Sequence, residues 1–232
     1  MRAAWLFGSI ATVAGCGADD VVCPSAVGFT LTAPAGFVEV IDGAPVTVAW
    51  RATGDAGATV RLTATATDLP LTAPLPVANL GDGMVTWDGR DATGARVPPA
   101  NYQLGGEVAA VGGCAGTTIA PDALHLIVVR GVRLPTGALT FTGGTPAPLI
   151  TVTTVTRASV ALALTLDPDP TVAGDELTIV EATVPGEFTP VARMYPFTGT
   201  TVDGAAIPAG DYTLGATFGA AAVVGPVVHW TP

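Results

Sequence analysis

The chain of 232 residues contains no lysine, and its nine basic residues are arginines spread singly along the sequence. Its 19 acidic residues give a formal net charge of −10. Proteins that follow nucleic-acid phosphates need a clustered basic surface. The sequence therefore predicts no nucleic-acid partner.

Residue types that commonly perform catalysis are also scarce. The two histidines, His125 and His229, fall in apolar segments that we interpret as half-buried strands. Behind the N-terminal segment the only serines are Ser25 and Ser159, and no histidine or cysteine has zinc-ligand spacing. We expect no enzymatic activity and no cofactor.

Helical patterning is missing as well, because no stretch combines a helical apolar period with cap signals. Instead, threonine alternates with aliphatic residues in short segments that are separated by Gly, Pro and Asp, which is typical of strands and turns. These segments are 46–50, 59–65, 139–142, 160–165 and 177–180. The sequence predicts an all-β protein.

A motif that occurs twice, 110 positions apart, dominates the rest of the sequence. The first copy runs from Trp87 to Leu104 and the second from Phe197 to Leu214. The coinciding positions are Gly89/Gly199, Gly94/Gly204, Pro98/Pro208 and Tyr102/Tyr212, flanked by Met84/Met194 and Gly105/Gly215. A repeat without gaps predicts two superposable domains in which the two tyrosines occupy equivalent buried positions.

Each copy is interpreted as a strand, a tight loop and a second strand. The aromatic residue ends the first strand, and Gly94 or Gly204 supplies the positive φ that a tight turn needs. Pro98 or Pro208 then holds the chain extended. The following Tyr and Leu alternate with polar residues, so both should face a core.

The first copy resembles the signature of an immunoglobulin-like domain found in the flagellar hook-capping protein and, as a separate module, in many secreted bacterial proteins. The second copy departs from that signature at Phe197 and Thr198, where the family has Trp and Asp. The resemblance implies two tandem immunoglobulin-like (fibronectin III-like) β-sandwiches that serve as spacers or assembly modules without catalytic residues. We expect the domains at 24–130 and 131–232, joined by a short connection at 131–137.

The N-terminus has the features of an export signal at residues 1–15. One arginine precedes a short apolar run, and Val13-Ala14-Gly15-Cys16 resembles the lipobox of bacterial lipoproteins. The resemblance implies that Cys16 is lipidated, that 16–23 form a tether, and that the protein is anchored to a membrane. Gly17 after the cysteine favours the outer membrane; an ordinary secretory signal is the alternative.

The cysteine count fits this interpretation. The chain has three cysteines, and lipidation of Cys16 would leave Cys23 and Cys114 as an even pair in an oxidising compartment. We expect these two to form a disulfide inside the first domain. Two unpaired buried thiols are the alternative.

Acidic loops are the one candidate for a ligand site. Asp88 and Asp91 lie in the first motif, and Asp167 and Asp169 in a loop of the second domain. Oxygen ligands on turns suit calcium, but aspartate also caps its own turn. We treat calcium as a weak candidate and predict no other metal.

Two functions remain open. The first is a non-enzymatic, lipid-anchored envelope protein that acts as a structural spacer or a protein-interaction module, with an exposed sheet edge as one route of contact. The second is an adhesive or ligand-binding surface lipoprotein that recognises glycan or peptide through its loops. A concave, aromatic-lined pocket would favour the second, and smooth sandwich faces would favour the first.

Overall fold

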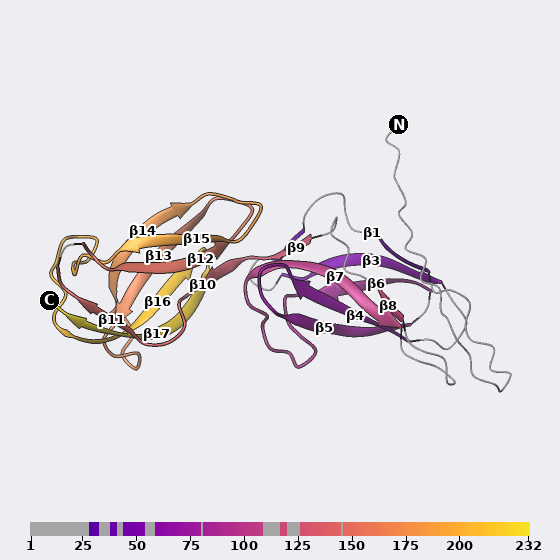
Figure 1. Cartoon of the computed structure of the whole chain (residues 1–232), viewed down its shortest axis with the longest axis horizontal. Coiled ribbons are helices and arrows are strands. Elements are labelled where there is room, and N and C mark those ends of the chain that lie inside the picture. The colour runs from indigo at the N-terminus through magenta and orange to yellow at the C-terminus, as the bar shows by residue number, and fades with distance from the viewer. Residues whose placement is uncertain are drawn as a thin grey trace. The chain divides into compact units, whose positions relative to one another are not determined.

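The fold is all-β in the computed structural model of the chain (Figure 1). The structure describes residues 28–32, 38–40, 44–53, 59–79, 81–108, 117–119, 126–144 and 146–232. These residues contain strands and turns and no helix. The chain forms two compact units. The first consists of Met1–Val97 with Asn101–Val128, and the second of Pro98–Ala100 with Val129–Pro232.

The first unit contains two sheets. The three-stranded sheet has the order β1 (Gly28–Thr32), β3 (Val46–Thr53), β6 (Gly81–Trp87). The other sheet has the order β2 (Val38–Val40), β9 (Leu126–Val129), β7 (Ala100–Val108), β4 (Thr59–Ala66), β5 (Thr72–Asn79), and β8 (Thr117–Ile119) also pairs with β7.

The second unit repeats this arrangement. Its three-stranded sheet has the order β10 (Gly131–Arg133), β12 (Leu149–Val155), β15 (Val191–Pro196). Its five-stranded sheet has the order β11 (Leu139–Thr142), β17 (Ala221–Thr231), β16 (Gly210–Phe218), β13 (Val160–Asp167), β14 (Leu177–Val184). Strand β11 runs parallel to β17, and the other described pairs of this unit are antiparallel.

The two units therefore have the same strand order. Strands β1, β3 and β6 of the first unit correspond to β10, β12 and β15 of the second, and each set forms one sheet. This is the arrangement of an immunoglobulin-like sandwich. Strands β7 and β16 begin 110 positions apart and place Tyr102 and Tyr212 third in each. Both tyrosines are buried, at 0% and 6% exposure. The prediction of an all-β fold with two immunoglobulin-like sandwiches is confirmed.

Alternation of side chains builds the core of the second unit. Along β13, Leu162, Leu164 and Leu166 are buried, whereas Ala161 is exposed and Ala163 is partly exposed. The leucines join one apolar cluster with Ile150 and Val152 from the opposite sheet. Burying a side chain of this size contributes about 1.5–3 kcal/mol, so this pattern of period two fixes which face of β13 points inward.

The expected connection at 131–137 is wrong in its first half. Strand β10 starts directly after Arg130, and its Val132 is 2% exposed within the core of the second unit. Glycine and proline between Gly131 and Gly137 suggested a connection, but Val132 can pair with Thr154 of β12 and bury its side chain there. The chain changes direction further along this segment, at Gly137, which has a φ of 84°.

None of the described residues forms a helix long and apolar enough to cross a membrane.

Candidate functional site

The repeated motif folds into the same loop in both units. Gly89 and Gly94 have φ values of 78° and 84°, and Gly199 and Gly204 have 73° and 88°. The backbone N–H of Val97 donates to the carbonyl of Gly89 at 2.9 Å, and Ile207 donates to Gly199 at 2.9 Å. The predicted positive φ at Gly94 and Gly204 is confirmed, and glycine adopts it without steric cost.

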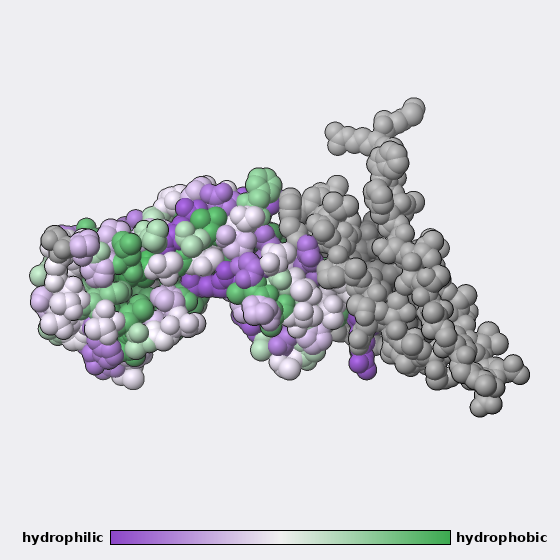
Figure 2. Space-filling model, viewed as in Figure 1, coloured by the Kyte–Doolittle hydropathy of each residue, from purple (hydrophilic) through white to green (hydrophobic). Residues whose placement is uncertain are grey.

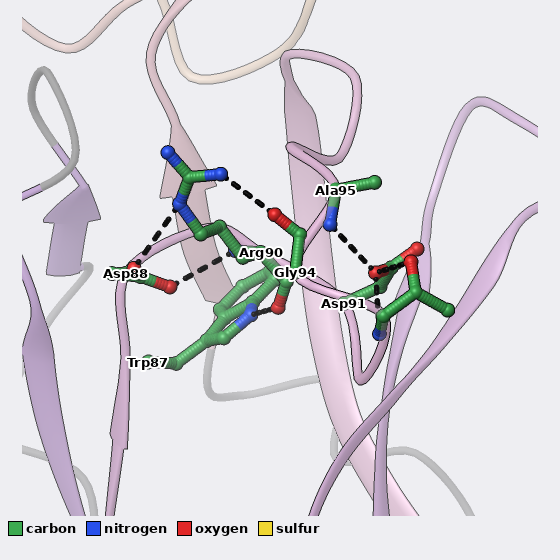
Figure 3. Close-up of polar contacts among 7 residues, drawn as sticks. Trp87, Asp88, Arg90, Asp91, Gly94 and Ala95 are labelled. Carbon is green, nitrogen blue, oxygen red and sulfur yellow. Dashed lines mark hydrogen bonds and ion pairs between the residues drawn. The ribbon is translucent and has the colours of Figure 1, made fainter.

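Asp91 holds the first loop together (Figure 3). Its Oδ1 accepts hydrogen bonds from the backbone N–H of Thr93 at 2.9 Å, the Thr93 hydroxyl at 2.6 Å and the backbone N–H of Ala95 at 3.0 Å. The Thr93 hydroxyl, followed by backbone donors, lowers the pKa of the Asp91 carboxyl.

The second loop reaches the same geometry with the two residue types exchanged. Thr201 stands at the position of Asp91, and Asp203 stands at the position of Thr93. The Thr201 hydroxyl accepts from the backbone N–H of Ala205 at 3.0 Å and donates to Asp203. This hydrogen bond is the main reason why the pKa of Asp203 is lowered.

Trp87 and Arg90 close the other side of the first loop. The Trp87 indole donates to the Arg90 carbonyl at 2.6 Å, and the Arg90 guanidinium donates to the Gly94 carbonyl at 2.6 Å (Figure 3). Asp88 accepts from the Arg90 backbone at 3.2 Å and lies 3.5 Å from the Arg90 Nε. The charged groups of the loop thus bind its own backbone and one another.

Aromatic packing joins each loop to its domain core. In the first unit Trp87 and Tyr102 meet edge to face with ring centroids 5.3 Å apart. In the second unit Phe197 replaces the tryptophan and packs edge to face on Trp230 at 4.8 Å. Trp230 of β17 brings an indole donor to this loop, which binds the Ile207 carbonyl at 3.1 Å, at the place of Val97 and not of Arg90.

Tyr212 makes the hydrogen bond that a buried tyrosine usually needs. Its hydroxyl donates to the carbonyl of Pro208 at 2.9 Å. A tyrosine near the start of this strand, bonded to the backbone a few residues upstream, is the tyrosine corner of immunoglobulin-like domains. Burial raises the pKa of the Tyr212 phenol.

The carboxylates of the calcium candidates accept hydrogen bonds from their own turns. Asp167 Oδ1 accepts from the backbone N–H of Asp169 at 2.9 Å, and Asp169 Oδ1 accepts from the backbone N–H and hydroxyl of Thr171 at 3.0 and 2.6 Å. Asp88 and Asp91 behave similarly, as described above. Among the described ranges no group of three or more His, Cys, Asp or Glu residues could hold a metal ion. The turn-capping interpretation accounts for these four aspartates.

His229 agrees with the expectation of a half-buried strand residue. Its side chain is 46% exposed, because the alternation of β17 buries Val228 and Trp230 and turns His229 outward. Its Nδ1 lies 2.6 Å from Asp211 Oδ1. Ser159 precedes β13 at the opposite end of the sheet, since β13 runs antiparallel to β16. The structure does not bring Ser159 and His229 together.

The remaining predicted site residues lie outside the described residues. These are Cys16, Cys23, Cys114, Ser25 and His125. Lipidation and the disulfide stay predictions.

Sequence reasoning missed an arginine on the edge strand β15. Arg193 pairs with the buried Val152, so its side chain points between the sheets, where its Nε donates to the Thr154 hydroxyl at 3.0 Å. Glu187 lies 3.5 Å from its Nη2. An inward-pointing charge protects an edge strand against pairing with another chain. In the sequence, only the alternation of inward and outward side chains along β15, where the next residue Met194 faces outward, could have indicated this orientation.

The β14 edge of the five-stranded sheet is protected by other means. Strand β14 has an irregular register beside Leu164, and the backbone N–H of Val202 caps the carbonyl of Thr178 at 2.9 Å. Bulges and covering loops both limit the addition of a further strand.

Exposed apolar side chains in the second unit are dispersed. The largest are Leu149, Val172, Phe188, Met194, Val202, Val224 and Val227, which come from different strands and loops. Figure 2 shows hydrophobic and hydrophilic residues in small groups on the visible face of this unit. Single exposed hydrophobic residues are normal on protein surfaces.

The solved structures to which the chain is similar include two that cover most of it with low TM-scores. The crystal structure of CBD12 from CALX1.2 is 8% identical, with 82% of this chain and 78% of that chain covered and a TM-score of 0.22. The ICAM-5 D1–D4 ectodomain fragment is 15% identical, with 87% of this chain and 53% of that chain covered and a TM-score of 0.24. No protein-family model matches the sequence. No curated protein matches it.

Proposed function

We propose that this chain is a non-enzymatic, lipid-anchored protein of the bacterial cell envelope whose two immunoglobulin-like domains act as a protein-interaction module on a short spacer. The hook-capping type of immunoglobulin-like domain is the family that its first motif resembles. Export and anchoring are supported by the sequence around Cys16 and by the even cysteine pair that lipidation would leave.

One observation carries the choice between interaction module and loop-based adhesin. In both motif loops the polar side chains bind the backbone of their own loop, through Asp91 and Arg90 in the first and Thr201 in the second. A loop whose acceptors already hold its own N–H groups has fewer groups to offer a glycan or peptide. The structure therefore favours sheet surfaces over these loops as contact sites.

Two of the four edge strands of the second unit, β15 and β14, support contact through a face more than through an added strand. Arg193 protects β15, and the register irregularity with the Val202 cap limits β14. Strand addition needs an open row of backbone groups, so the outer faces of the sheets are the better candidates.

The anchoring half of the proposal is tested by replacing Cys16 with Ser in the full-length protein. We expect the wild type in the membrane fraction, labelled by an alkyne fatty acid, and Cys16→Ser in the soluble fraction without label. Cys23→Ser is the matched control and should remain anchored and labelled. Fatty-acid labelling of Cys16→Ser, or its retention in membranes, would show that Cys16 is not the anchor.

A further inference from the structure

The outer face of the five-stranded sheet in the second unit is hollowed. A trough of about 410 Å³ lies over β14, β13 and β16. Ala161 and Ala163 form its floor, Glu181 and Thr183 line one side, and Thr217 and Gly219 line the other. Small side chains on the central strand create the depression, because Glu181 and Thr183 on one side and Thr217 on the other are longer.

The first unit has a long side chain at the equivalent position. Leu62 pairs with Gly106, and Leu164 pairs with Ala216, which lies 110 positions later. By the same register, Arg61 of the first unit corresponds to Ala163 of the second. Arg61 is exposed, and the ladder places it opposite Glu107.

In the second unit both charges of that pair are gone, because Ala163 and Thr217 stand at the places of Arg61 and Glu107. An acid is instead present on the other neighbouring strand, at the place of Val77. Ala163 pairs with Thr217 on one side and with Glu181 on the other. Glu181 is exposed and, within the described part of the chain, makes no hydrogen bond or ion pair. The trough therefore combines an empty place for one long side chain with an unpaired carboxylate beside it.

We propose that this trough docks an extended segment of a partner protein and takes an arginine or lysine of that segment over Ala163, against Glu181. The partner would supply from outside the cation that Arg61 supplies within the first domain. The net charge of −10 and the absence of lysine favour encounter with a basic segment. The hydroxyls of Thr183 and Thr217 add hydrogen-bonding groups for its backbone. This inference rests on the proposed role as an interaction module and names its site and partner class.

The test is a selection of linear random peptides on phage against the full-length protein. We expect the enriched peptides to carry Arg or Lys. Ala163→Arg, which copies the first domain, should weaken their binding at least tenfold, or about 1.4 kcal/mol. Glu181→Gln should weaken it, and Glu181→Lys should shift the selection toward acidic peptides. Ala192→Arg, the same substitution at an exposed position of the opposite sheet, should leave binding unchanged.

The melting curve of each variant shows whether it folds. If Ala163→Arg alone disrupts the fold, the double variant Ala163→Arg/Thr217→Glu, which copies the pair of Arg61 and Glu107 in the first domain, takes its place. Peptides without basic residues, binding that survives Ala163→Arg, or no enrichment would overturn the proposal. Self-association of the protein that Ala163→Arg abolishes would identify a second copy as the occupant and would also overturn it. Lipid labelling of Cys16 is unaffected by any of these results, so a failure of the trough is distinguishable from a failure of the anchor.

Discussion

Asp91 and Thr201 occupy the same place in two loops 110 positions apart, and each accepts a hydrogen bond at 3.0 Å from the backbone N–H four residues further on. Their partners two residues on, Thr93 and Asp203, are exchanged in the same way. The loop geometry thus requires one carboxylate and one hydroxyl, in either order.

This exchange predicts that the two residues can be swapped in the first domain. Asp91→Thr alone should lower the denaturation midpoint of the first domain, because the N–H and hydroxyl of Thr93 lose their acceptor. Adding Thr93→Asp should recover most of the loss, since Thr201 and Asp203 already form this pair. Chemical denaturation measures both; a double variant no more stable than Asp91→Thr would refute the equivalence of the loops.

The lowered pKa of Asp91 predicts a pH dependence of stability. The folded-state pKa lies below the ordinary value of 3.8, so the carboxylate stabilises the fold above that value. The contribution is lost as the pH falls through the lowered folded-state pKa. The wild type should therefore be more stable than Asp91→Asn at about pH 6, and the difference between the two melting temperatures should shrink as the pH falls below 3.8. Melting curves that stay parallel over this range would contradict the assignment.

Two glycines of one loop should respond differently to alanine. At Gly204, with φ 88° and open space around the Cβ position, Gly204→Ala should cost about 1–2 kcal/mol for the left-handed backbone alone. At Gly199, with φ 73°, the added Cβ would lie 2.5 Å from Cζ2 of Trp230. Overpacking adds about 1–3 kcal/mol, so Gly199→Ala should be the more destabilised variant. Equal denaturation midpoints would show that Trp230 does not pack here.

The tyrosine corner predicts a selective effect of removing one hydroxyl. Tyr212→Phe should cost about 1–2 kcal/mol, because the carbonyl of Pro208 loses its donor. Tyr195, which is partly exposed and has no hydrogen bond from its hydroxyl among the described residues, is the control, and Tyr195→Phe should change stability by less than about 0.5 kcal/mol. Denaturation of both variants decides; a similar loss for the two would remove the special role of Tyr212.

Much of this fold could be predicted from the sequence, because the two copies of the motif keep the same residues where the backbone has a positive φ. Positive φ at Gly94 and Gly204 leaves few residue choices, and the alternation of Tyr102 and Leu104 marks an inward face. The apolar alternation of 160–165 and 177–180 likewise falls inside β13 and β14. These are local signals that a single stretch of chain carries.

Features that depend on pairing between distant strands were not readable. Trp230 brings an indole donor to the second loop from a different strand than Trp87 does in the first, and no local pattern links it to Phe197. The orientation of Arg193 follows from its partner Val152, and the trough follows from Ala163 lying between Thr217 and Glu181. Register decides each of these, and composition does not reveal register.

The measurement that tests the account most directly is site-specific photo-crosslinking in the cells that produce the protein. A photoreactive side chain is placed at Thr183, on the side of the trough, so that the place over Ala163 stays open, or at Ala192 on the opposite sheet of the same domain. We predict a discrete protein adduct from position 183 that disappears when Glu181→Lys is added, and no such adduct from position 192. Equal adducts from the two positions, or an adduct at 183 that is indifferent to Glu181→Lys, would contradict the claim that this domain binds a partner through that face.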